Sequence, residues 1–324
     1  MRIGLRTGIH LTAAVAMLLG AVAVAPQASA APTPAPATAP VRQLKVDGAL
    51  AATLQPHAAQ YTAHAVALSP NKSGVFQWEG GTTWSQIGGP AANLYAGFGY
   101  VVATSPQNGD VYLYSGAGQS WTRVGGPGRV FGFAPETDGY IHLYGLAPDG
   151  SGVFRWTGSG ATWTQVGGPA SWMYTGGAGM FATSPQNGNI YQFTGTPNVW
   201  NQVGGPGKSF AVNNTSLFGL TPNGGAVFRW NGSGTAWTQW GGPAGWVYAG
   251  GSGLLATNPS SGDVFLNNGA ANDWRQIGGP GADFEISSAS QIFGLTPSRN
   301  AVNLWQGGTT WVTIGGPASV VVAE

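Results

Sequence analysis

The sequence of 324 residues contains no cysteine, and only 7% of its residues are charged. Without cysteine the chain has no thiolate nucleophile, no Cys-ligated metal and no disulfide, so its fold must be held by its core and its topology. The net charge of +1 provides neither a basic stripe for nucleic acid nor an acidic tail, and we expect no nucleic-acid partner. No window shows the apolar period of a helix, and the 55 glycines disfavour helices further.

Long hydrophobic runs are also missing, except near the N-terminus. Leu11–Ala25 is apolar but short for a bilayer span. Arg2 and Arg6 precede this run, and the small residues Ala28-Ser29-Ala30 follow it. Residues 1–30 are therefore predicted to be a secretory signal peptide, with a membrane anchor as the alternative. We expect a secreted, extracellular protein with no membrane span elsewhere.

The mature part divides into a short linker and a long repeat region. Residues 31–53 are rich in Ala and Pro, and the proline spacing of "APTPAPATAP" favours an extended tether. Residues 54–324 carry the repeats.

The repeat is marked by a tryptophan followed four residues later by Gly-Gly-Pro. The spacings between successive copies are 37, 42, 37, 37, 37 and 37 residues. A period of this length is typical of solenoids, propellers and arrays. The seven repeat tryptophans are Trp84, Trp121, Trp163, Trp200, Trp237, Trp274 and Trp311.

Within one period the pattern indicates short β-strands. In residues 169–206, four apolar runs are separated by clusters of Gly, Pro and Asn. Four short strands per repeat are the composition of a propeller blade. The sequence therefore predicts an all-β, seven-bladed propeller of four-stranded blades.

The repeated phrase has a mechanical interpretation. We expect each repeat tryptophan to begin the outermost strand of its blade and to wedge against the neighbouring blade. Gly-Gly-Pro then returns the chain to the ring centre, because glycine permits positive φ and proline presets its own φ. These tryptophans are expected to be structural rather than ligand-binding.

The copies alternate between two forms. The first form follows "GGPA" and spans Ala91–Pro127, Ala170–Pro206 and Ala244–Pro280, whereas the second follows "GGPG". The first repeat belongs to the second form through "VALSPNKSGVFQW". With seven blades, the alternation must break where the last blade meets the first.

A terminal strand must close the ring. Ser319–Ala323 lies where the first strand of an eighth repeat would begin, and "PHAAQYT" at 56–62 is the other candidate. We favour the C-terminal segment, because its addition removes the open sheet edges.

The motifs "W-x-x-V-G-G", "LFGL-x-P" and "VFRW" resemble those of tectonin-type repeats, and they are similar to repeats of tachylectin-like and bacterial propeller lectins. The resemblance covers the repeat region. It implies a propeller that binds carbohydrate, in innate recognition or in cell-surface adhesion. The Gly-Gly-Pro return departs from that pattern, so no sugar-binding residue is carried over.

The inventory of reactive residues argues against an enzyme. None of the histidines occupies a repeated position, and the segment "APETDGYIH", which contains the one five-residue insertion, places Glu136 and Asp138 near His142. A metal or acid–base pair there is the alternative to a solvated loop. We expect no catalytic residue, no metal and no cofactor.

The surface composition favours neutral glycans. Hydroxyl and amide groups hydrogen-bond sugar hydroxyls, and flat rings stack on apolar sugar faces. We expect a lectin-like protein with multiple weak sites for glycoconjugates on cell surfaces or for polysaccharides. The alternatives are a protein-interaction scaffold without sugar binding and, less favoured, a propeller hydrolase.

A candidate site comes from comparing the two forms. Three and five residues after proline, the "GGPA" repeats carry side chains that share one strand face. We predict that the tryptophans stack on sugar and the tyrosines donate hydrogen bonds, with blade packing as the alternative for both. The pairs are Trp172 and Tyr174, Trp246 and Tyr248, and the weaker Asn93 and Tyr95.

Overall fold

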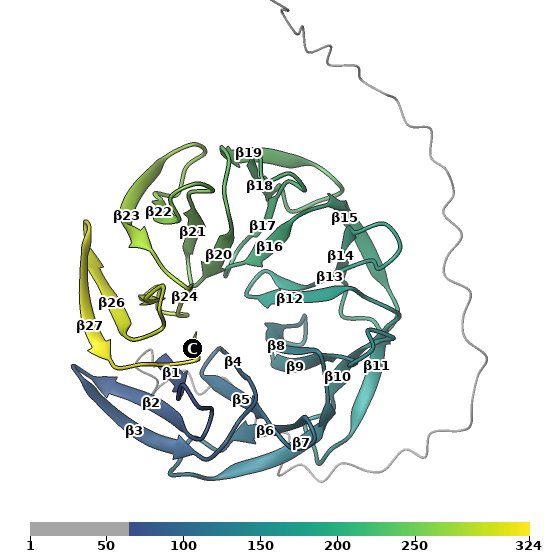
Figure 1. Ribbon diagram of the computed structural model, residues 1–324. Coiled ribbons are helices and arrows are strands. Elements are labelled where there is room, and N and C mark those ends of the chain that lie inside the picture. Colours follow the sequence, from purple (N-terminus) through teal and green to yellow (C-terminus); the bar gives the residue numbers. More distant parts are fainter. Residues whose placement is uncertain (1–64) are drawn as a thin grey trace, which may run out of the picture. The chain divides into compact units, whose positions relative to one another are not determined.

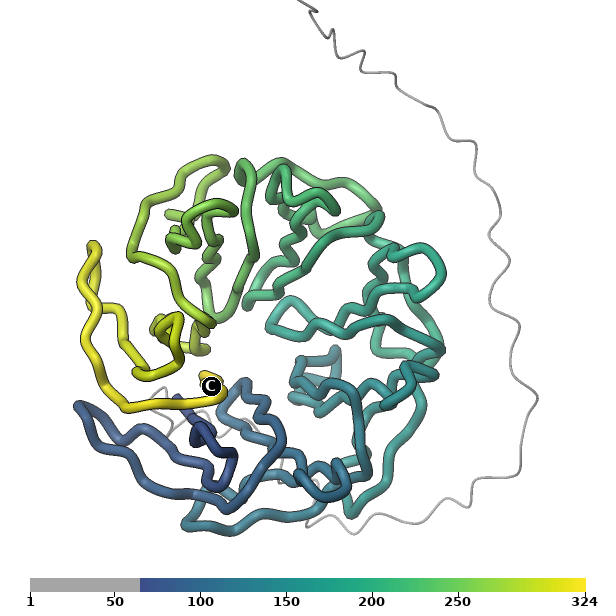
Figure 2. The backbone as a smooth tube through the Cα atoms, in the orientation of Figure 1, coloured from purple at the N-terminus to yellow at the C-terminus, as the bar shows by residue number. Residues whose placement is uncertain are grey.

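The computed structural model describes residues 65–324, which form a ring of seven four-stranded antiparallel sheets (Figure 1). The chain passes around the ring from one sheet to the next, and its C-terminus returns to the centre beside the first strand (Figure 2). The predicted all-β, seven-bladed propeller is confirmed. The predicted signal peptide, the linker and the segment 56–62 lie outside the described residues.

Every blade has the same strand order, with the inner strand hydrogen-bonded to the second and the outer strand at the rim. From inner to outer strand, blade 1 contains β28 (Val320–Ala323), β1 (Ala65–Leu68), β2 (Val75–Gly80) and β3 (Thr83–Gly88). Blade 2 contains β4 (Leu94–Gly97), β5 (Tyr100–Thr104), β6 (Asp110–Tyr114) and β7 (Trp121–Pro127), and blade 3 contains β8 (Val130–Pro135), β9 (Ile141–Leu146), β10 (Val153–Trp156) and β11 (Trp163–Gly167). Blade 4 contains β12 (Trp172–Gly176), β13 (Gly179–Thr183), β14 (Asn189–Phe193) and β15 (Trp200–Pro206), and blade 5 contains β16 (Ser209–Val212), β17 (Leu217–Leu220), β18 (Val227–Trp230) and β19 (Trp237–Gly241). Blade 6 contains β20 (Val247–Gly250), β21 (Gly253–Thr257), β22 (Asp263–Asn267) and β23 (Trp274–Pro280), and blade 7 contains β24 (Asp283–Ile286), β25 (Ile292–Leu295), β26 (Val302–Gly307) and β27 (Thr310–Gly315).

Residues 65–324 contain no helix, and hence none that is long and apolar enough to cross a membrane.

The C-terminal strand closes the ring, as predicted. β28 is the inner strand of blade 1 and pairs antiparallel with β1, with Ala323 opposite Ala65 and Val320 opposite Leu68. Ser319 extends this pairing, since its backbone N–H donates to the carbonyl of Leu68 at 2.8 Å. First and last segments of the propeller therefore share one sheet, which leaves no open edge at the seam.

The seven repeat tryptophans form identical links between blades. Each lies on an outer strand, and its indole N–H donates to a backbone carbonyl on the outer strand of the preceding blade, at 2.6 to 2.9 Å. Trp84 makes this bond to Ile314 and so spans the seam between blades 7 and 1. The predicted wedge is thus present at every interface between blades.

The Gly-Gly-Pro return requires one correction. None of its glycines has a positive φ, so the expectation that they serve left-handed turns is wrong. The first glycine is instead needed for close approach: a Cβ on Gly204 would lie 2.8 Å from Nε1 of Trp237, and a Cβ on Gly125 would lie 2.5 Å from Nε1 of Trp163. The same crowding occurs at all seven returns, so each glycine makes room for the next blade's wedge. Nothing in the structure requires the second glycine.

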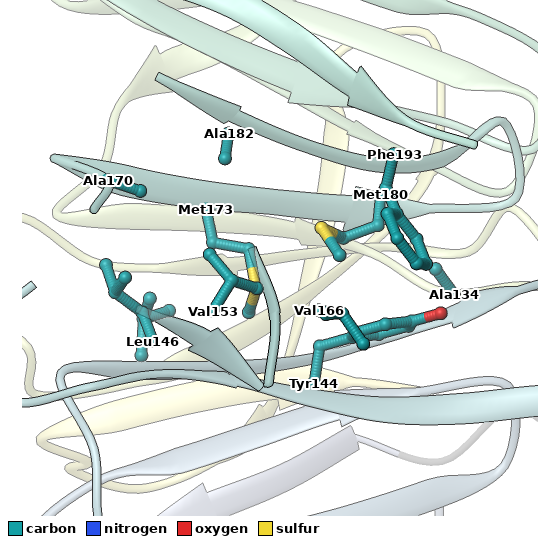
Figure 3. Packing of buried hydrophobic residues seen from close by; sticks show 11 residues of the cluster. Ala134, Tyr144, Leu146, Val153, Val166, Ala170, Met173, Met180, Ala182 and Phe193 are labelled. Atoms are coloured by element: carbon teal, nitrogen blue, oxygen red, sulfur yellow. The ribbon is translucent and has the colours of Figure 1, made fainter. Parts of the chain in front are cut away.

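The core lies between blades rather than in the ring centre. At the interface of blades 3 and 4, Tyr144 and Leu146 of β9 face Met173 of β12 and Met180 of β13 (Figure 3). Equivalent apolar clusters fill the other interfaces. Strands therefore bury both sheet faces, which explains why their sequences show little clean alternation.

A second series of tryptophans distinguishes the blades of the second form. Trp78, Trp156, Trp230 and Trp305 lie on third strands, directly opposite the wedge tryptophans of their own blades. These four residues mark blades 1, 3, 5 and 7. Blades 7 and 1 are neighbours across the seam, so the alternation breaks there as predicted.

The seam contains a buried acid that predicts a pH dependence. The Glu324 side chain follows β28, is only 4% exposed, and burial raises its pKa to about 7. Because the proton is held more tightly in the folded than in the unfolded state, stability should fall as pH rises from about 4.5 to about 7. We expect Glu324→Gln to be more stable than wild type above pH 7, by on the order of 3 kcal/mol, and equal to it near pH 4.

Thermal unfolding across this pH range measures the difference. Glu79→Gln, at an exposed position, is the matched control and should show no such trend. A difference between Glu324→Gln and wild type that stays constant with pH would contradict the assignment.

Candidate functional site

The two candidate tryptophans lie exposed at equivalent places on the ring. Trp172 is 42% exposed at the start of β12, and Trp246 is 46% exposed one residue before β20. Asn93 is exposed at the same place before β4. All three lie where a Gly-Gly-Pro return enters an inner strand, on the side of the ring that we call the return face. They belong to blades 2, 4 and 6, so they form separate positions two blades apart and not one composite site.

The backbone under these side chains is fixed. The Trp246 N–H donates to Oγ1 of Thr257 at 3.0 Å, and its carbonyl accepts from the Thr257 N–H. Asn93 makes the same two bonds with Thr104. An exposed ring on a rigid backbone loses little further freedom when it binds a ligand.

The three tyrosines are partly buried between blades. Their rings pack edge-to-face against a phenylalanine of the next inner strand, with centroid separations of 5.5 to 5.7 Å. The pairs are Tyr95 with Phe131, Tyr174 with Phe210, and Tyr248 with Phe284. Burial raises the pKa of all three phenols, that of Tyr174 to about 12, so they remain protonated.

The tyrosines therefore pack between blades. The sequence left this role open as the alternative to ligand binding. No hydrogen bond joins their hydroxyls to another of residues 65–324, and none of these hydroxyls is among the fully buried unpaired atoms, so each can meet water or a ligand. Strand alternation places Trp172 on the same sheet face as Tyr174. Trp172 with Tyr174, and Trp246 with Tyr248, thus each combine an exposed ring with a partly buried phenol.

A cavity between blades 4 and 5 is a second candidate, which the sequence did not reveal. It has a volume of about 540 Å³ and is lined by Trp200, Trp230, the amides of Gln192, Asn201 and Gln202, and Ser233. The two indole N–H groups already donate to backbone carbonyls. The lining therefore combines aromatic residues, whose N–H groups are already used, with amide and hydroxyl residues, a composition that suits a neutral sugar.

This cavity joins residues of two successive repeats, from β14 and β15 of blade 4 and from β18 and the turn after it in blade 5. A sequence signal exists in hindsight: the third-strand tryptophan and the "GSG" turn after it recur in blades 3 and 5.

The insertion in blade 3 forms a compact polar cluster. It lengthens the hairpin of β8 and β9, so that Ala134 pairs with His142. Oδ2 of Asp138 lies 2.9 Å from Nε2 of His142, and Glu136 accepts hydrogen bonds from Tyr144 and, at 2.6 Å, from Arg155.

Ligand atoms of Glu136, Asp138 and His142 lie within 4.8 Å of one another, as a metal site would require. However, both oxygens of Glu136 are already used, and the guanidinium of Arg155 neutralises its charge. The donor set therefore suits an internal ion pair better than a cation.

Comparison with known proteins places the fold and nothing finer. No family model matches the sequence, and no curated protein matches it. A streptogramin B lyase structure has a TM-score of 0.51 and 12% identity, covering 72% of this chain and 90% of the lyase. YCF48 bound to a D1 peptide has a TM-score of 0.47 and 13% identity, covering 78% and 86%. The GH74 xyloglucanase from Xanthomonas campestris has a TM-score of 0.45 and 16% identity, covering 76% of this chain and 43% of the xyloglucanase.

This chain therefore spans less than half of the xyloglucanase chain. At identities this low the likeness shows the propeller fold alone. The resemblance to tectonin-type repeats stays a prediction.

Proposed function

We propose that the protein is a secreted, non-enzymatic, lectin-like propeller that binds glycans at several weak sites on its return face. The observation that carries the proposal is the pair of exposed indoles, Trp172 and Trp246, at equivalent positions two blades apart. Within the described residues only five large hydrophobic side chains are exposed, and these are the two tryptophans among them. Two equivalent positions of the fold each carry a solvent-exposed tryptophan. Ligand binding explains this repetition better than packing does.

The surroundings suit a sugar. An indole face stacks on the apolar face of a pyranose, and the neighbouring backbone and hydroxyl groups can hydrogen-bond its hydroxyls. Such a site is weak alone, but linked sites on a polymer or a glycan-coated surface raise avidity by roughly 10²–10⁴ when the spacing fits. Polysaccharides or cell-surface glycoconjugates are therefore the proposed partners, in keeping with the predicted export signal.

The decisive variants remove the two rings. We expect Trp172→Ala with Trp246→Ala to abolish binding to glycan-coated surfaces, and each single change to weaken it by about tenfold or more through lost avidity. Because both rings are exposed, the melting temperature should change little. Binding on a glycan array and thermal unfolding, measured on the same preparations, test both statements.

Val199→Ala removes another exposed apolar side chain and serves as the matched control. Retained glycan binding in the double variant would show that Trp172 and Trp246 are not the binding site. Absence of any glycan binding by wild type, with capture of a protein by the same two rings, would favour the scaffold alternative. Turnover of a glycoside would favour an enzyme.

A further inference from the structure

Four basic side chains occupy equivalent points on the return face. Each donates, at 2.5 to 3.2 Å, to the backbone carbonyl of the residue just before an inner-strand position equivalent to that of Trp172 and Trp246. Arg129 reaches the carbonyl of Ser171 beside Trp172, and Lys208 reaches that of Gly245 beside Trp246. Lys72 does the same beside Asn93, and Arg299 beside Val320. All four are exposed.

The basic residue that reaches this carbonyl occupies one of two different positions in the repeat. In blades 3 and 5 the cation follows Gly-Gly-Pro-Gly, as Arg129 and Lys208, and the turn after the second strand has Gly150 or Gly224. In blades 1 and 7 that same turn position holds Lys72 or Arg299, and the residue before the inner strand is uncharged. Both arrangements deliver the charge to one structural place, so the charge itself is what the repeats share.

Stability is a poor reason for this arrangement. A hydrogen bond from an exposed cation to a solvated carbonyl contributes little, and holding a long side chain in place costs rotamer entropy. The other cations of residues 65–324 have partners elsewhere: Arg123 pairs with Asp110, Arg155 with Glu136, and Arg229 and Arg275 stack on tryptophans.

The four return-face cations, by contrast, form no salt bridge with a carboxylate of the described residues. Lysine has three donors and arginine five. Each side chain therefore keeps donors that can meet an anionic group.

Building on the proposed function, we infer that the glycans bound at Trp172 and Trp246, the two tryptophan platforms, are acidic. A sugar carboxylate is bound by the adjacent cation while the sugar ring stacks on the indole. At both platforms the cation donates to the carbonyl of the residue immediately before the tryptophan, so the positive charge lies beside the residue that carries the exposed ring. The ligand class is a uronic acid polymer rather than a neutral glycan.

The two platforms should differ in strength. Nε of Arg129 also donates to the carbonyl of Pro148 at 3.3 Å, which holds the guanidinium near Asp149, the next residue, and this carboxylate offsets part of the positive field. In blade 5 the position equivalent to Asp149 holds the uncharged Asn223, so Lys208 has no such neighbour in its turn. Trp246 with Lys208 is therefore expected to bind the acidic sugar more tightly than Trp172 with Arg129.

The test compares one polymer with and without its charge. Binding of the full chain to immobilised polygalacturonate and to its carboxyl-reduced form, of matched length, is measured at low and at physiological salt. We expect at least about tenfold tighter binding to the acidic polymer at low salt, narrowing as salt screens the charges. Lys208→Gln should lose most of this preference, Arg129→Gln less, and both should bind the reduced polymer as wild type does. Arg123→Gln, which removes the same charge from an outer strand, should leave the preference intact.

Four outcomes would overturn the inference. Equal binding to both polymers by wild type would show that the ligand is neutral, and the proposed function would stand. An unchanged preference in Lys208→Gln with a lowered melting temperature would show that the cation only links the blades. If neither polymer binds while array glycans still require Trp172 and Trp246, the acidic class is wrong and the lectin function is right. If the array also gives no hits, both are wrong.

Discussion

Trp237→Ala should destabilise the protein by about 3–5 kcal/mol, the usual cost of removing a large aromatic side chain from a packed position. The indole of Trp237 lies between blades 4 and 5, donates to the Val203 carbonyl at 2.7 Å, and packs against Phe210. Truncation leaves a cavity between the blades and an unpaired carbonyl, and each of these defects is unfavourable. Denaturant unfolding monitored by far-ultraviolet circular dichroism measures the loss.

Two further variants separate the parts of this effect. Trp237→Phe keeps most of the ring volume but not the N–H, and should lose about 1–2 kcal/mol. Gly204→Ala places a methyl group 2.8 Å from Nε1 of Trp237, and should lose about 1–3 kcal/mol through overpacking. If Trp237→Ala costs less than about 1 kcal/mol, the wedge interpretation is wrong.

The period of the tryptophans was sufficient to predict the blades, their number and their closure. A repeated supersecondary unit cannot bury its faces alone, so seven copies imply seven neighbours in a ring. The role of glycine in the return was not predictable in the same way. Gly204 is adjacent in sequence to Val203, but the atom that excludes a side chain there belongs to Trp237 of the next repeat. The backbone angle φ of a glycine can be judged from its own segment. The close approach of another side chain depends on two segments and cannot.

The candidate site shows the same limit. Strand parity correctly placed Trp172 and Tyr174 on one face, but it could not tell that one ring faces solvent and the other packs on Phe210. That difference depends on a partner in the next blade, because the ring of Tyr174 packs on Phe210 of β16. The cavity of Trp200 and Trp230 and the cations Arg129 and Lys208 were missed for a related reason. Each connects two blades, and a single repeat contains only half of the arrangement.

Removal of residues 318–324 should have an effect as large as that of the tryptophan. It takes away the whole of β28, whose side chains Val321, Val322 and Ala323 are buried in the interfaces with blades 7 and 2. Their burial contributes roughly 5 kcal/mol. The deletion also leaves the backbone of β1 as an unpaired edge in the middle of the ring.

An exposed edge of this kind accepts strands from other molecules, so the truncated protein should form dimers and larger aggregates as well as melt earlier. Light scattering and thermal unfolding on matched concentrations measure both effects. A synthetic peptide of residues 316–324 added in trans should restore the monomer and part of the lost melting temperature, because it supplies the missing strand without the covalent connection. A peptide of the same composition in scrambled order is the control. If the truncated chain stays monomeric and melts with wild type, β28 does not hold the ring closed, and the seven tryptophan wedges alone must be sufficient to keep blade 7 against blade 1.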